Sequence, residues 1–175
     1  MTGPEIDYAA AYRDLPIAVV LLTPEFEMAD VNLAYLQVTG RTREELLGRN
    51  IFDAFPDNPS DPDANGVREL SASLARVLVT SKPDALSMQR YDAEVPGCPG
   101  VYAQRYWCPV NAPVFGPDGR VVLIAHCVEE ITDRVSKFMH GLMDSNARER
   151  YESAETTAAS MTAGTHNRRA PGAKS

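Results

Sequence analysis

DVNLAYLQVTGRTREELLGRN, residues 30–50, is the stretch of this sequence that decides the fold. Its first half, VNLAYLQVTG (31–40), has apolar residues at helical spacing and ends at Gly40, a residue typical of a helix C-terminus. Its second half, TREELLG, opens with Thr42 as the N-cap and Glu45 three residues later as its capping-box partner. The stretch therefore predicts two short helices in immediate succession.

The segment before these helices predicts a β-hairpin. IAVVLLT (17–23) is a short apolar run rich in β-branched residues, and EMADVN (27–32) is a second run of strand type. Pro24 and the two residues after it separate the runs. We expect the two runs to pair as antiparallel strands.

The longest predicted helix is GVRELSASLARVLVTSKP (66–83), which follows the polar loop PDNPSDPDANG (56–66) and ends at Pro83. Its apolar stripe consists of Val67, Leu70, Leu74, Val77 and Leu78. Such a stripe indicates a helix that buries one face against the rest of the domain.

Three strands are predicted after this helix, over residues 85–94, 102–115 and 120–132. The turn sequence GPDG (116–119) joins the last two strands as a hairpin. Runs of strands on both sides of a block of helices predict an α+β fold with an antiparallel sheet and the helices on one face.

The two ends of the chain are predicted to flank one domain over residues 16–133. Residues 1–15 are expected to form an N-terminal flanking helix, and residues 134–152 a C-terminal linker helix. Residues 153–175 are rich in Ala, Ser, Thr and Gly, with hardly any large apolar side chain. Such a segment cannot bury enough surface to offset its ordering entropy, so we predict a disordered tail.

Composition and charge restrict the class of protein. A net charge of −7 and a pI near 4.9 argue against a nucleic-acid or anionic-membrane surface, because phosphate contacts need clustered Lys and Arg. No apolar run approaches the roughly 20 residues that span a bilayer, and the N-terminus does not resemble a signal peptide. We therefore expect a cytoplasmic protein in a reducing compartment.

The opening stretch, extended to DVNLAYLQVTGRTREELLGRNIFDAFPDNP (30–59), resembles the N-terminal half of a PAS domain. The family's hallmark is an Asn that begins a short helix, followed by the run T-G-x-x-x-E-E-L-L-G-R. The matching positions here are Asn32, Thr39, Gly40, Glu44, Glu45, Leu46, Leu47, Gly48 and Arg49. Residues 130–133, Glu-Ile-Thr-Asp, are similar to the family's closing Asp-Ile-Thr element.

This resemblance covers roughly residues 10–133. The combination of RYWCPVNAPV (105–114) with IAHCVEEIT (124–132) is similar to PAS modules that precede bacterial, especially actinobacterial, histidine kinases and regulators. It implies a five-stranded antiparallel sheet, with short helices and one longer helix around a small cavity. It also implies a module that senses a signal or pairs with another chain. We expect residues 16–133 to be that domain.

The resemblance leads us to expect a ligand pocket between helix 66–83 and the last two strands. Leu70, Leu74 and Tyr106 are the predicted lining residues, together with Ile124 and His126. Side chains alternate along a strand, so the neighbours of opposite parity are the alternative to the last two.

Cys108, His126 and Cys127 are the candidates for metal or redox chemistry, with Cys98 in the loop PGCPG. His126 and Cys127 are adjacent in a strand and point to opposite sheet faces, so a regular strand cannot bring both to one metal. No Cys-x-x-Cys spacing is present. We expect Cys108 and Cys127 to be small buried side chains in the sheet.

His126 has three interpretations: a hydrogen-bonded core histidine, a haem ligand, or a polar contact to a small ligand. In haem-binding relatives the ligand usually sits on the long helix, and 66–83 contains no His. The Asn-Cys-Arg-Phe-Leu-Gln motif of light-oxygen-voltage flavin domains is absent, because residues 48–53 read GRNIFD. Arg90 and Arg105, beside aromatic residues, either pack across strands or hold an anionic group.

The main functional hypothesis is a non-catalytic PAS sensory or interaction module that couples a small-molecule or redox signal to a histidine kinase or regulatory partner. A haem- or flavin-binding redox or gas sensor is the first alternative, and a small-molecule enzyme on a cupped α+β fold is the second. The sequence contains no enzyme motif.

Strand 120–132 is apolar on both faces over its first half, so its outer face needs a cover. We predict a homodimer in which this face and residues 5–15 or 131–143 of two chains pack together.

Overall fold

The computed structural model describes residues 5–143 and 145. By its contacts the chain divides into two units, residues 1–132 and residues 133–175. The first unit holds every named strand and helix below. Residues 132–143 are helical, and the predicted linker helix spans residues 134–152. The rest of that helix, apart from residue 145, and the predicted tail lie outside the described residues.

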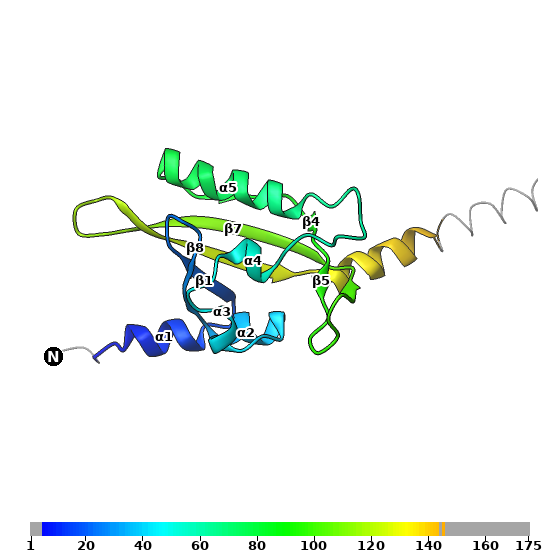
Figure 1. Ribbon diagram of the computed structural model, residues 1–175, viewed down its shortest axis with the longest axis horizontal. Helices are drawn as coiled ribbons and strands as arrows, with labels where there is room; N and C mark the ends of the chain where they lie inside the picture. Colours follow the sequence, from blue (N-terminus) through cyan, green and yellow to red (C-terminus); the bar gives the residue numbers. More distant parts are fainter. Residues whose placement is uncertain (1–4, 144, 146–175) are drawn as a thin grey trace, which may run out of the picture. The chain divides into compact units, whose positions relative to one another are not determined.

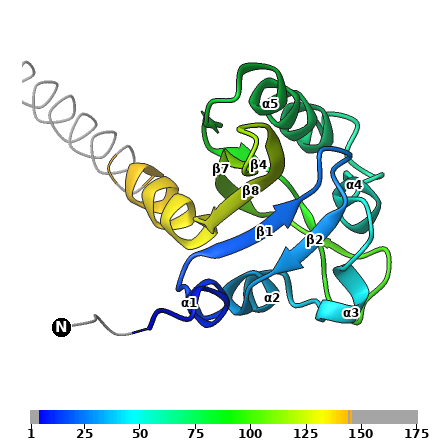
Figure 2. The ribbon, with the colours of Figure 1, turned by 90° about the vertical axis from the view of Figure 1, so that its left-hand side faces the viewer.

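The first unit is built on an antiparallel sheet with the strand order β2-β1-β8-β7-β3, and β4 pairs with β7 beyond that path (Figures 1 and 2). Its strands are β1 (Ala18–Leu22), β2 (Met28–Val31), β3 (Asp84–Ala85), β4 (Gln89–Arg90), β7 (Tyr106–Phe115) and β8 (Val121–Glu130). A separate pair is formed by β5 (Ala93–Glu94) and β6 (Tyr102–Ala103). The predicted α+β class and both predicted hairpins are confirmed.

Helices fill the chain between β2 and β3. They are α2 (Leu33–Thr39), α3 (Arg43–Leu46), α4 (Ile51–Ala54) and α5 (Gly66–Thr80), and α1 (Tyr8–Asp14) precedes β1. The capping box between Thr42 and Glu45 is present, and Gly40 ends α2 in the left-handed conformation, both as the sequence predicts. Helix α5 runs along β7 (Figure 1).

The predicted strand 85–94 and the five-strand count are wrong in detail. Ala85 faces Val110, whereas Gln89 faces Trp107, so this strand carries one extra residue relative to β7. Such a bulge interrupts the ladder and splits the segment into the short strands β3, β4 and β5. The predicted strand 102–115 is likewise divided into β6 and β7.

Asn32 holds the start of α2 to the first strand. Its Oδ1 accepts hydrogen bonds from the backbone N–H of Val19 at 3.0 Å and of Tyr35 at 2.9 Å. Its Nδ2 donates to the carbonyl of Ile17 at 2.8 Å, and the side chain is fully buried. One amide thus caps a helix and connects that helix to the edge of the hairpin.

The core lies between the sheet and helices α2 to α5. Its fully buried apolar side chains are Val20, Leu22, Met28, Leu46, Leu74, Val77 and Ile124. Ile124 and His126 point inward from β8, as preferred in the sequence analysis, and Ile124 is part of this core. Inward parity on β8 therefore places His126 on the helix side of the sheet.

We define the outer face as the outward-pointing residues of the three central strands. They are Val19 and Leu21 of β1, Leu123, Ala125 and Cys127 of β8, and Val110, Ala112 and Val114 of β7. Val110 is 42% exposed. Helix α1 reaches one end of this face, where the Tyr12 hydroxyl donates to the carbonyl of Val19 at 3.2 Å. The second face of β8 is therefore apolar, as predicted.

Candidate functional site

A cavity of about 300 Å³ lies within the first unit, between the helices and the sheet. Its apolar and aromatic walls include Tyr35, Val38, Ile51, Ala54, Phe55, Leu70, Tyr91, Trp107, Pro109 and Val128. Its polar lining includes Gln37, Thr39, Arg41, Gln89, Asp92, Glu94, Arg105, His126 and Glu130. Helices α2, α4 and α5 thus contribute one side, and β4 to β8 contribute the other.

The structure brings two of the five predicted site residues to this cavity, Leu70 from α5 and His126 from β8. Leu74 and Ile124 are fully buried in the apolar core and are not among the lining residues. Tyr106 is also outside the lining, and the Gln104 side chain donates to its hydroxyl at 2.9 Å. Tyr106 is outside the lining because side chains alternate along β7, and the inward-pointing ones are Trp107, Pro109 and Asn111.

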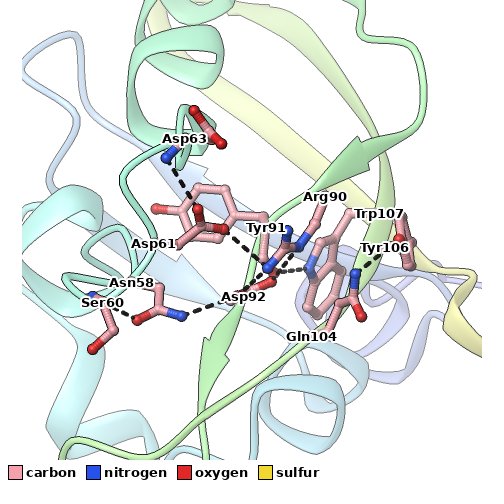
Figure 3. A network of polar contacts seen from close by, with 10 residues as sticks. All are labelled: Asn58, Ser60, Asp61, Asp63, Arg90, Tyr91, Asp92, Gln104, Tyr106 and Trp107. Carbon is pink, nitrogen blue, oxygen red and sulfur yellow. Dashed lines mark hydrogen bonds and ion pairs between the residues drawn. The ribbon is translucent and has the colours of Figure 1, made fainter.

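One wall of the cavity is held by a polar network that ties the loop after α4 to β4 (Figure 3). The Arg90 guanidinium lies 2.9 Å from carboxylate oxygens of both Asp61 and Asp92, and Asn58 donates to Asp92 at 3.0 Å. The indole N–H of Trp107 donates to the Tyr91 carbonyl at 2.9 Å. These bonds fix the positions of Tyr91, Asp92 and Trp107, which line the cavity.

Tyr91 closes the cavity against the start of α5. Its hydroxyl donates to the carbonyl of Phe55, and its ring lies directly over Gly66, where a methyl group would come within 2.0 Å of Cδ2. Only glycine allows the ring and the helix to approach this closely.

Every charged side chain in the lining has a partner of opposite charge. Arg41 lies 3.0 Å from Glu94, and Arg105 lies 2.6 Å from Glu130. Asp92 is paired with Arg90, as described above. The arginines that the sequence offered as anion holders are therefore already neutralised by carboxylates of the same domain.

A chain of hydrogen bonds connects the cavity with the surface near the start of β3. His126 Nδ1 lies 2.6 Å from Asn111 Oδ1, and Asn111 Nδ2 donates to Ser73 Oγ at 2.7 Å. Ser73 Oγ donates to Asp84 Oδ2 at 2.5 Å, and Arg76 binds both oxygens of Asp84 at 2.8 and 3.0 Å. We call these five residues the relay.

The inner members of the relay are removed from solvent. Asn111 and Ser73 are fully buried, and His126 is 4% exposed. Burial lowers the pKa of His126 from 6.5 to about 4, so the imidazole is neutral at pH 7. At the surface end, hydrogen bonds from Arg76 and then Ser73 lower the pKa of Asp84, which stays ionised.

Two buried polar groups in the lining have no hydrogen-bond partner among the described residues: His126 Nε2 and the Tyr35 hydroxyl. Over the same part of the chain, every side-chain N or O atom that is sealed from solvent does have a partner. These two groups are therefore open to the cavity. Burial raises the pKa of Tyr35, so its hydroxyl keeps its proton.

Sequence reasoning missed Tyr35, Asn111 and Ser73. The helical spacing of apolar residues in 31–40 predicts the helix that carries Tyr35. It does not indicate which face of that helix lines the cavity. Asn111 and Ser73 belong to strand and helix patterns that are otherwise apolar, and a polar residue at such a position is the signal that could have identified them.

The cysteines do not form a site in the described part of the chain. All three are free thiols; Cys108 faces Glu129 and Cys127 faces Val110 across the β7–β8 ladder. Over residues 5–143 and 145, no group of three His, Cys, Asp or Glu side chains could hold a metal ion. Nor does any helix in these residues have the length and hydropathy to cross a bilayer.

Comparisons with known proteins agree on the fold. A family model described as "PAS fold" matches residues 12–136. The PAS domain of a protein from Colwellia psychrerythraea is 13% identical, with a TM-score of 0.54, over 72% of this chain and 95% of that chain. No curated protein is a significant match.

Two further solved structures are similar. The PAS domain of Bordetella pertussis BvgS is 22% identical, with a TM-score of 0.54, over 78% of this chain and 93% of that chain. The PAS domain of the nitrogen regulation protein NR(II) from Vibrio parahaemolyticus is 12% identical, with a TM-score of 0.51, over 73% and 100% of the two chains. At these identities the similarity concerns the fold alone.

Proposed function

The chain belongs to the PAS family, and from that premise we propose that it is a non-catalytic sensory module that binds a small molecule in its cavity. The observation that carries the proposal is a cavity of about 300 Å³ into which two buried, unpartnered polar groups open, His126 Nε2 and the Tyr35 hydroxyl. Small-molecule pockets start at about this volume, and combine apolar walls with a few polar groups that orient the ligand.

The composition of the walls supports a ligand rather than a structural void. A void without a function is normally apolar, because a buried polar group without a partner costs about 1–3 kcal/mol of stability. A ligand or bound water that pairs with His126 and Tyr35 would recover that free energy. Both side chains are at least nine-tenths buried, so bulk solvent reaches them only through the cavity.

Fragment screening by NMR tests this proposal. We expect members of a chemically varied fragment library to shift the methyl signals of Leu70 and Val128, which line the cavity. Val128→Phe should fill the cavity and abolish these shifts. Val122→Phe is the matched control, because Val122 lies on the same strand and is 44% exposed. The proposal would be contradicted if no fragment in the library binds, or if Val128→Phe leaves the binding of every hit unchanged.

The visible spectrum of freshly purified protein separates a small colourless ligand from the haem and flavin alternatives. A Soret band would establish haem, and peaks near the flavin absorption bands would establish a flavin. Either result would replace the proposed ligand class. We expect neither, because residues 48–53 lack the flavin-adduct cysteine and α5 contains no histidine.

We further infer that the module forms a homodimer and acts on a histidine kinase or regulatory partner in the cytoplasm. The outer face supports the dimer, because it consists of eight neighbouring apolar side chains on three strands, among which Val110 is 42% exposed in one chain. The regulatory role is proposed on the basis of the PAS family match over residues 12–136.

A further inference from the structure

The residues at the surface end of the relay determine which partner donates in each of its hydrogen bonds. Asp84 is a carboxylate held by two hydrogen bonds from Arg76, so it can only accept a hydrogen bond from Ser73. The Ser73 hydroxyl has one proton, and that proton is committed to Asp84. Toward the interior, Ser73 Oγ can therefore only accept.

The directions of the next two hydrogen bonds in the relay are then fixed. Asn111 must present its Nδ2 to Ser73, which leaves Oδ1 to face His126. Because Oδ1 only accepts, His126 Nδ1 must carry the proton. A neutral imidazole has one N–H, so Nε2 has a lone pair and no proton. The Asp84 carboxylate near the surface thus determines that His126 presents a hydrogen-bond acceptor to the cavity.

The charges of the lining restrict the ligand further. Arg41, Arg105, Glu94 and Glu130 are paired with one another at 3.0 Å or less. A charged ligand would have to break one of these pairs or be buried without a counter-ion, and both are costly. The Tyr35 hydroxyl adds no restriction, since it both donates and accepts.

We propose that the Asp84 carboxylate, acting through Ser73 and Asn111, fixes the His126 imidazole as its Nδ1–H tautomer and so selects a neutral ligand that donates a hydrogen bond, from a hydroxyl or N–H group, to His126 Nε2. The inference about the ligand rests on the proposed function, because it requires that the cavity binds a small molecule. The inference about the tautomer does not, because it concerns the protein alone.

The tautomer is measured first, on the ligand-free protein. In ¹⁵N-histidine-labelled protein at pH 7, His126 is identified by the signal that His126→Gln removes. We expect a protonated Nδ1 and an unprotonated Nε2. Asp84→Asn, which can donate to Ser73, should allow the relay to reverse and should populate the Nε2–H form. Arg76→Gln is the matched control, since it keeps the Asp84 carboxylate and should keep the tautomer.

A protonated Nε2 in the unmodified protein would overturn the proposal. So would an Asp84→Asn variant that folds, by its circular dichroism and thermal transition, and keeps the Nδ1–H form entirely. Neither result depends on whether any ligand has been found.

The ligand class is measured with pairs of probes that differ in one donor: phenol against anisole, and indole against N-methylindole. We expect the donor of each pair to bind the unmodified protein at least about tenfold more tightly, because a paired buried acceptor replaces an unpaired one. The preference should fall in Asp84→Asn and remain in Arg76→Gln.

The two proposals fail in different ways. Equal binding within both pairs, with the Nδ1–H tautomer observed, would overturn the selection of donors and leave a ligand-binding cavity. If no probe binds and the fragment library also has no hit in the cavity, the proposed function itself is wrong. If the library binds but only through molecules that lack a donor, the proposed ligand class alone is wrong.

Discussion

His126 and Asn111 face each other across the β8–β7 ladder, and Nδ1 of the histidine lies 2.6 Å from Oδ1 of the asparagine. The pair is buried on the helix side of the sheet, and the Asn111 amide in turn donates to Ser73. A protonated imidazole at this place would carry a buried positive charge without a carboxylate in contact. The pair is therefore stable only while His126 is neutral.

Acid should weaken the fold through His126. The pKa of this histidine is about 4 in the folded state and about 6.5 in the unfolded state. Between these values the unfolded chain binds a proton that the folded chain does not, so the free energy of unfolding falls as pH falls through this window. The full difference corresponds to about 3 kcal/mol. Urea denaturation at a series of pH values measures it.

Carboxylates such as Asp84 and Asp92, whose pKa values are lowered in the folded state, also lose stabilising interactions in acid. A variant series isolates the histidine. His126→Gln keeps a side chain that can donate to Asn111 and should remove most of the slope between pH 6.5 and 4. His140→Gln replaces an exposed histidine and should leave the slope unchanged. Equal slopes in all three proteins would contradict the assignment to His126.

Local signals in the sequence were sufficient for the first half of the fold. Thr42 and Glu45 form the predicted capping box and Gly40 the predicted C-cap, because capping depends on residues three or four positions apart. Which residues line the cavity depends instead on how strands that are distant in the sequence pair with one another. Leu74 and Tyr106 were predicted to line the cavity, but the bulge before β4 and the parity of β7 bring Tyr91 and Trp107 there instead.

Asn32 should be among the most sensitive positions of the domain. Asn32→Ala removes the N-cap of α2 and leaves the N–H of Val19 and the carbonyl of Ile17 without their buried partner. The expected loss in the free energy of unfolding is on the order of 3 kcal/mol, measured by urea denaturation. Asn32→Asp should not restore it, because a carboxylate cannot donate to Ile17.

Asn50→Ala is the matched control for Asn32. Asn50 caps α4 through the N–H of Phe52 at 3.0 Å, but its side chain is only partly buried, whereas that of Asn32 is fully buried. Water replaces the lost partners there, so the cost should stay near about 1 kcal/mol. Similar losses at the two positions would mean that burial is not what distinguishes Asn32.

Gly66→Ala should disturb the wall of the cavity. The added methyl group would lie 2.0 Å from Cδ2 of Tyr91, so the ring must move and its hydroxyl must leave the carbonyl of Phe55. Overpacking of this kind costs roughly 1–3 kcal/mol, despite the better helix propensity of alanine. Thermal or urea denaturation measures the loss.

A double mutant tests the cause. If the clash with the ring is responsible, Gly66→Ala combined with Tyr91→Ala should cost clearly less than the sum of the two single changes. Gly141→Ala, where a methyl group meets nothing within 4 Å, should not lower stability. Additive losses at Gly66 and Tyr91 would show that the two residues do not interact as described.

The outer face should hold two chains together. Leu123 lies at the β7–β8 hairpin end of this face, opposite Val114 and two residues before Ala125, and each of these side chains is only half-buried in one chain. Light scattering at micromolar concentration should give twice 19.1 kDa for the unmodified protein. Leu123→Glu places a charge among apolar side chains and should give the mass of one chain. Val122→Glu, on the same strand but at a position that is 44% exposed, should remain a dimer. A monomeric unmodified protein would contradict the dimer.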